Sequence, residues 1–271
     1  MAYRLPVPNT SLAEIDSLKT GDKLIARAAR GRWFFVGMAS VMIATTIAGF
    51  LPAIISPATR HAPLSPLAAV HGIVFFAFQL LYLAQSLLVA TRHVAWHRRL
   101  GVTSVVLLAL IIPLSFATTT AMVRRGFDLS GDQRIVPHPA AGSIYLDAPA
   151  SSLFNFAVLF TFSVLAIAAI LYRRRPEIHK RLMLFANLAL MRTAIAHLVG
   201  HIPQTGDTGV TIWLSYTLFL LTAVARDYLV EKRVRAMTAV IAIGMWVSPP
   251  IEGLVIAPSA TWHRFAEWIS Q

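Results

Sequence analysis

Cysteine is absent from the 271 residues. This absence excludes disulfides, thiolate metal sites, iron–sulfur clusters and the covalent attachment of c-type haem. Lysine is scarce as well, and it occurs only as Lys19, Lys23, Lys180 and Lys232. No lysine therefore lies in the last apolar segment, where a retinal Schiff base would need one, and a rhodopsin is excluded.

Charged residues of either sign are also few. They make up 13% of the chain, whereas hydrophobic residues make up 56%. A soluble domain carries about 25% charged residues. The apolar residues come in runs of about 20, which is enough to cross roughly 30 Å of hydrocarbon. The composition predicts an integral membrane protein with a single membrane domain.

Acidic residues are the scarcer charged class, with 12 Asp and Glu against 24 Lys and Arg and a formal net charge of +12. The positive charge is divided among short loops between apolar segments. Anionic lipid on one leaflet is therefore the expected partner, together with the bilayer itself, and nucleic acid is not.

Seven apolar segments predict an all-α bundle of seven transmembrane helices. They cover about 33–51, 67–90, 102–122, 153–172, 182–200, 211–225 and a last span from 236 to the Pro249-Pro250 pair. That pair is expected to break or kink its helix, and a kink is expected at Pro113. The longest connection, about 123–152, is long enough to have a function of its own.

The two ends of the chain differ from the membrane domain, which we expect over residues 32–258. Residues 1–31 are polar and basic and predict a cytoplasmic leader of two short amphipathic helices on the membrane surface. Residues 259–271 place Trp262, Phe265 and Trp268 on one side of a helix. This tail is expected to be an interfacial anchor.

The orientation follows from the positive residues. Eighteen Lys and Arg lie in the leader and in every second connection, and five lie in the alternating segments. The positive-inside rule then places the N-terminus in the cytoplasm and the C-terminus outside.

Histidines form two layers in this topology. His71 opens the second span and His197 and His201 close the fifth, near the outer face. His97 closes the second span and His179 opens the fifth, near the cytoplasmic face. The second span also carries Tyr82 and Gln85 on the stripe of His71, so we expect it to be a central helix.

Haem b held by two neutral imidazoles from facing helices is one interpretation of these layers. His71 with His197 would form the outer site, and His97 with His179 a possible inner one. Tyr82, Gln85 and Thr193 would support the ligands. The function would then be that of a membrane redox protein that exchanges electrons with quinone or a small reductant.

Two other interpretations are open. A zinc-dependent membrane hydrolase could use His71, the i, i+4 pair His197 and His201, and Asp207 as an open metal site. A transporter or accessory subunit would need no cofactor. Histidines in basic loops also commonly bind lipid headgroups or cap helices without further purpose.

Arg192 is unusual because it lies near the middle of the fifth span. Burying a lone guanidinium costs several kcal/mol or more. Glu252, just beyond the proline pair, is the acidic residue at a comparable depth. We therefore expect Arg192 and Glu252 to form a buried charge pair.

Several of these segments resemble an uncharacterised family of multi-span membrane proteins of bacteria. The resemblance rests on His71-Gly72 with Gln85, the turns His97-Arg98-Arg99-Leu100-Gly101 and His179-Lys180-Arg181-Leu182-Met183, and the stretch from Trp246 to Trp268. It implies the bacterial cytoplasmic (inner) membrane and brings no established activity.

The layered histidines also resemble, more loosely, the ascorbate-type di-haem cytochromes b, in which paired histidines on four core helices hold two haems. This chain departs from that pattern, because both ligand pairs would come from the second and fifth spans. Seven-span hydrolases with histidine-bound zinc resemble it in topology, although their histidine pair and acidic residues are not matched here.

Overall fold

The computed structural model describes residues 12–56, 63–125, 148–202 and 207–271, and of residues 12–30 the backbone alone. Every regular element in these residues is helical. Seven of the helices are long and apolar enough to cross a membrane. The predicted all-α bundle of seven spans is thus confirmed.

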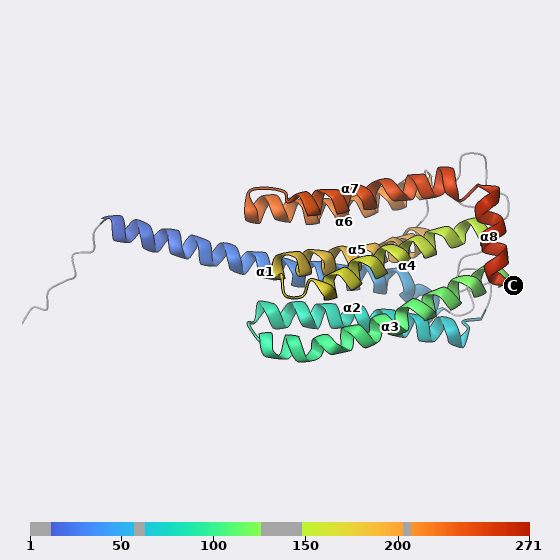
Figure 1. Cartoon of the computed structure of the whole chain (residues 1–271), viewed down its shortest axis with the longest axis horizontal. Helices are drawn as coiled ribbons and strands as arrows, with labels where there is room; N and C mark the ends of the chain where they lie inside the picture. Colours follow the sequence, from blue (N-terminus) through green and yellow to red (C-terminus); the bar gives the residue numbers. More distant parts are fainter. Residues whose placement is uncertain (1–11, 57–62, 126–147, 203–206) are drawn as a thin grey trace, which may run out of the picture.

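The helices run up and down along one common axis (Figure 1). Their bounds are α1 Leu12–Ile55, α2 Pro66–Ala90, α3 Val94–Arg125, α4 Ala148–Leu171, α5 Pro176–Gly200, α6 Thr208–Glu231, α7 Ala236–Ile251, a π-helix η2 Glu252–Ile256, and α8 Ala260–Ser270. The turns α2–α3, α4–α5 and α6–α7 lie at one end of the bundle, and α8 lies at the other. Lys and Arg residues cluster in and beside these three turns, so we call their end the basic end.

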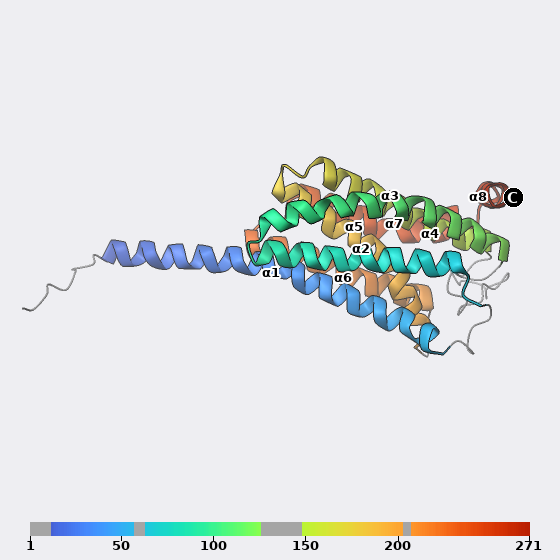
Figure 2. The same cartoon turned by 90° about the horizontal axis from the view of Figure 1, so that it is seen from below.

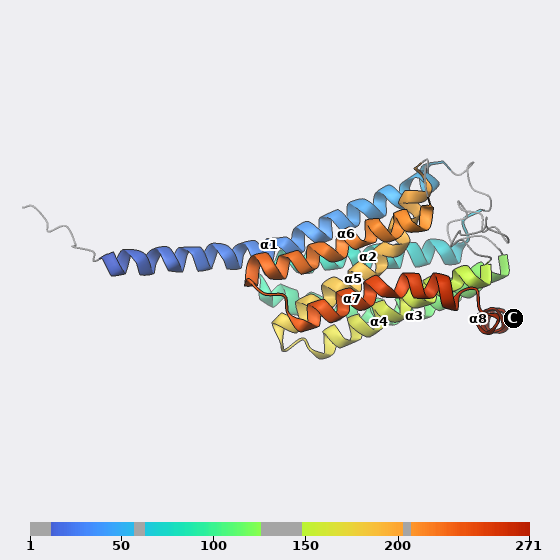
Figure 3. The same cartoon turned by 90° about the horizontal axis from the view of Figure 1, so that it is seen from above.

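The first helix is longer than expected. Residues 12–30 do not form separate short helices but continue into the first span as one helix of 44 residues. The part before Gly31 extends beyond the ends of the other helices (Figures 2 and 3). Gly21 costs a helix interior only about 1 kcal/mol relative to alanine, which the long helix tolerates.

The helix at the centre of the bundle is α5. In the most apolar stretch of α5, 72% of the residues are buried, whereas in every other candidate span the buried share is 39% or less. Ala186, Ala189 and Ala194 are at most 2% exposed. Small side chains of this kind let neighbouring helices approach closely. The expectation that the second span is the central helix was wrong. The polar side chains of α2, such as Tyr82 and Gln85, line a cavity, and the most buried span is α5.

The proline pair near the end of α7 does not end the helical segment. Pro249 and Pro250 lie inside α7, which passes directly into the π-helix η2. The Ala257 amide donates to the Glu252 carbonyl at 2.8 Å, five residues back. A wider turn of this type accommodates a helix that has lost backbone donors to proline. Helix α3 likewise continues through Pro113.

The tail forms α8, which crosses the end of the bundle instead of following its axis (Figures 1 and 2). Ser259 caps it by accepting from the Trp262 amide at 3.2 Å. The Trp262 indole donates to the Pro149 carbonyl at 2.8 Å and so ties α8 to α4. Trp268 is 68% exposed, and the role of this tail as an interfacial anchor stays a prediction.

Candidate functional site

A cavity of about 1660 Å³ opens at the basic end, and residues of α1, α2, α3, α4, α5 and α6 line it. Its apolar lining includes Phe35, Phe78 and Val105. Its uncharged polar residues are Tyr82, Gln85, Ser86, His97, Ser104 and His179. Eight Lys and Arg residues line it against two acidic ones, Glu177 and Glu231. The cavity thus joins an apolar body to a strongly positive mouth.

The turn before α3 puts His97 in this cavity. The backbone reverses at Arg92, whose φ is +67°. The His93 amide donates to the Leu88 carbonyl at 2.7 Å and the Arg92 amide to the Val89 carbonyl at 3.2 Å. These two bonds form a Schellman motif, which ends α2 abruptly. His97 therefore lies in the first turn of α3 and not, as predicted, at the end of the second span.

His179 reaches the cavity from the first turn of α5. Its Nδ1 lies 2.8 Å from the Ala169 carbonyl of α4. A carbonyl can only accept, so Nδ1 carries the proton and donates it. Nε2 then keeps a lone pair, and the hydrogen bond fixes the orientation of the ring.

The structure brings His97 and His179 together. Their ring centroids are 6.3 Å apart and the ring planes are inclined at 76°. Nδ1 of His97 is buried and has no hydrogen-bond partner among the described residues. The pair joins α3 to α5 across the cavity, so the two ligands would come from the third and fifth spans.

The outer histidines have different neighbours. Nδ1 of His71 lies 3.3 Å from the hydroxyl of Thr118 on α3, and its ring lies against Phe75 with centroids 4.4 Å apart. The ring of His197 is buried against Phe50 of α1, with centroids 4.2 Å apart. A metal centre shared by His71 and His197 remains a prediction.

The residues proposed for zinc are engaged elsewhere. Nε2 of His201 lies 3.0 Å from the Gly49 carbonyl. Asp207 caps α6 by accepting from the Val210 amide at 2.9 Å. Among the described residues no three His, Cys, Asp or Glu side chains are grouped as a metal site, so the set His71, His197, His201 and Asp207 is not assembled as one centre there.

The three residues that we expected to support the ligands, Tyr82, Gln85 and Thr193, do not lie at one site. Tyr82 and Gln85 of α2 line the cavity beside His97 and His179. Thr193 lies further along α5, one turn before His197 and outside the cavity lining. Of the three residues expected to support the ligands, only Tyr82 and Gln85 share a cavity with His97 and His179.

Arg192 and Glu252 form the expected ion pair. Nη2 of Arg192 lies 2.5 Å from Oε2 of Glu252, and Nη1 lies 3.3 Å from Oε1. The two side chains are 12% and 8% exposed. Phe154 of α4 lies 5.8 Å from the guanidinium carbon. The pair joins α5 to the π-helix.

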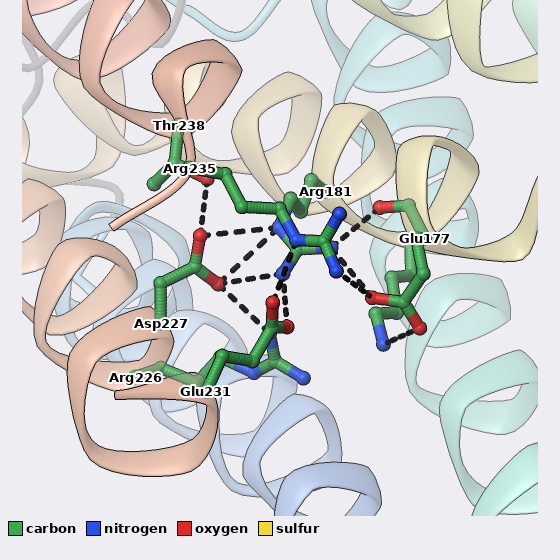
Figure 4. A network of polar contacts seen from close by, with 8 residues as sticks. Glu177, Arg181, Arg226, Asp227, Glu231, Arg235 and Thr238 are labelled. Atoms are coloured by element: carbon green, nitrogen blue, oxygen red, sulfur yellow. Dashed lines mark hydrogen bonds and ion pairs between the residues drawn. The ribbon is translucent and has the colours of Figure 1, made fainter. Parts of the chain in front are cut away.

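A second ionic network, which the sequence did not predict, connects α5, α6 and α7 at the basic end (Figure 4). At its centre, Arg181 donates to both carboxylate oxygens of Asp227 at 2.9 to 3.2 Å. Asp227 is 1% exposed and also accepts from Thr238 at 2.6 Å. The only sequence signal was a carboxylate at the end of the apolar sixth span.

The two acidic residues of the cavity wall belong to this ionic network. Glu177 accepts from Arg181 at 2.8 Å, and Glu231 accepts from Arg226 at 2.8 Å and from Arg235 at 2.6 Å. Both carboxylates are thereby neutralised. The remaining positive charge, which includes Arg32, faces the cavity without a carboxylate in its lining to balance it.

Comparison with protein-family models, with curated proteins and with solved structures finds no match for this chain. The functional assignment therefore rests on the residues and the geometry described above.

Proposed function

We propose that this integral membrane protein holds haem b between His97 and His179 and serves in membrane electron transfer. The observation that carries the proposal is the pair of imidazoles from α3 and α5, which line one cavity with ring centroids 6.3 Å apart. Histidines on facing helices are a common way for a bundle to bind a cofactor.

The spacing of the rings is one at which His97 and His179 would both be able to hold the metal of a haem. Two imidazole nitrogens at about 2 Å from one metal place the ring centroids about 6 Å apart. His179 also has the hydrogen bond that ligating histidines normally make, from the other ring nitrogen to a backbone carbonyl. Nδ1 of His97, buried without a partner among the described residues, is an atom that the chain alone leaves unsatisfied.

The charge of the cavity also fits. Haem carries two propionate groups, and arginine binds carboxylates through paired hydrogen bonds. Glu177 and Glu231 are engaged in the ionic network, so arginines such as Arg32 and Arg98 are available to such anions. The apolar wall, with Phe35 and Phe78, suits the flat face of a macrocycle.

Bound haem would supply a one-electron redox centre. The residues of the chain hold both imidazoles in the bundle, exclude water with the apolar wall and offset negative charge at the mouth. The partners we propose are a membrane quinone or a small reductant, with anionic lipid at the basic end and the bacterial cytoplasmic membrane as the location.

The test is the absorption spectrum of the purified protein between about 400 and 600 nm, with haem supplied during expression. We expect a Soret band that is lost in His97→Ala and in His179→Ala. His93→Ala is the matched control, because His93 lies in the same turn and its Nδ1 contacts only the Thr91 hydroxyl among the described residues. A wild-type protein without a Soret band would refute the proposal.

The same spectra decide between the two layers. If His71→Ala and His197→Ala remove the band while the inner variants keep it, the haem lies at the outer site. If each pair of variants removes half of the haem, the protein binds two. Retention of all haem in the outer variants is the expected result.

A further inference from the structure

Two buried polar side chains in the cavity lack partners. The Tyr82 hydroxyl and both polar atoms of the Gln85 amide make no hydrogen bond with the described residues. The side chains are 7% and 8% exposed. A buried donor or acceptor that is left unpaired destabilises the folded protein. Native structures rarely carry three such atoms at one place unless a ligand or water meets them.

The two residues form one polar spot. They are three positions apart on α2, which puts them on the same face of the helix, and both line the cavity. Ser86 is close enough to interact with the Tyr82 hydroxyl, although it does not meet the geometry of a hydrogen bond. A Cβ atom at Gly101 would lie 3.9 Å from the Gln85 amide nitrogen, so the amide lies against the backbone of α3.

The side chains of the polar spot are uncharged, and together they can both donate and accept hydrogen bonds. The amide nitrogen donates, the amide oxygen accepts, and the phenol does either. The walls near it are apolar, and Phe78 is 2% exposed. A carboxylate or phosphate would be held better by the arginines at the mouth, and it would repel the Gln85 oxygen. The spot instead fits an uncharged oxygen on an apolar ring.

We propose that Tyr82 and Gln85 bind a ring oxygen of a membrane quinone. The amide nitrogen and the phenol donate to the carbonyl of the oxidised form, and the amide oxygen accepts from the hydroxyl of the reduced form. This inference rests on the proposed redox function for the choice of a quinone among apolar carbonyl compounds.

The cavity has room for such a ligand beside a cofactor. Its volume of about 1660 Å³ exceeds the range of about 300–1000 Å³ that is usual for a single small-molecule pocket. The basic mouth and the polar spot also differ in chemistry, so an anionic cofactor edge and a neutral ring would not compete for the same groups.

The experiment measures binding of decylubiquinone to the protein in nanodiscs by equilibrium dialysis, with empty nanodiscs subtracted for partition into lipid. We expect Tyr82→Phe and Gln85→Leu each to weaken binding about tenfold, the effect of losing one hydrogen bond of about 1.4 kcal/mol. Gln85→Glu keeps the shape of the side chain and has no donor when its carboxyl group is ionised, so that form should bind the quinone more weakly as well.

Gln79→Leu is the matched control. Gln79 is on the same helix, 6% exposed, and its Oε1 also lacks a partner among the described residues, but it does not line the cavity. Its substitution should leave quinone binding unchanged. The Soret band of each variant, and a single peak in size-exclusion chromatography, show that the variant is folded and loaded.

The outcomes separate the two proposals. Quinone binding that depends on Tyr82 and Gln85 in a protein without a Soret band supports this site and refutes the haem. A Soret band with no quinone binding, or with binding that is equal in Gln85→Leu and Gln79→Leu, refutes this site and leaves the haem proposal standing. In that case water, not a ligand, satisfies the buried atoms.

Discussion

The ion pair of Arg192 and Glu252 offers a sharp test of the structure. Glu252→Leu leaves a guanidinium that is 12% exposed and faces Phe154. Arginine cannot lose its charge in a protein. Arg192→Leu instead leaves a carboxyl group that is 8% exposed and can become neutral by taking up a proton. The two single substitutions should therefore not be equivalent.

The magnitudes follow from the burial. Removing one partner of a buried pair costs about 3–5 kcal/mol, whereas replacing both by apolar residues is often neutral. We expect Glu252→Leu to lie at the top of this range and Arg192→Leu below it. The double variant should be close to the wild type. With about 2–4 °C per kcal/mol, the larger loss lowers Tm by roughly 10–20 °C.

The assay is thermal unfolding of the purified variants in one detergent, followed by intrinsic fluorescence. Leu254→Ala is the control, because Leu254 belongs to the same π-helix but is 68% exposed. It should change Tm little. If the losses of the two single variants add in the double variant, Arg192 and Glu252 do not interact, and the ion pair that joins α5 to η2 is refuted.

Two more predictions concern the arrangement of the helices. An alkaline-phosphatase fusion at the C-terminus should be active and one after Arg174 inactive, and the reverse activities would overturn the predicted orientation. Gly49→Ala should destabilise the protein, since its Cβ would lie 2.6 Å from the Ala194 carbonyl. Gly37→Ala, whose Cβ meets nothing within 4 Å, should be neutral or slightly stabilising; equal thermal stability of the two variants would show that α1 does not pack on α5 at Gly49.

Much of the fold could be predicted from composition alone. Apolar runs of about 20 residues must be helical in a bilayer, because hydrocarbon offers the backbone no other hydrogen bonds. The number of spans and the amphipathic tail followed from that rule and from the side-chain pattern. The pairing of Arg192 with Glu252 followed from depth, since few groups can neutralise a charge in mid-membrane.

Other features depend on contacts between distant segments, and sequence patterns did not predict them. The Schellman turn at Arg92 moved His97 from α2 to α3, because a single residue with positive φ ended one helix where a longer basic loop was expected. The network around Asp227 joins positions 46 residues apart, and no local pattern records such a distance.

The candidate site shows the same division. Residue types and spacing by themselves determined that histidines lie in two layers, that Tyr82 and Gln85 share a stripe, and that positive charge gathers at one end of the bundle. Only the tertiary structure decided which histidines meet, because a layer defines depth along the axis and not position around it. Packing around α5 brought His97 and His179 to one cavity.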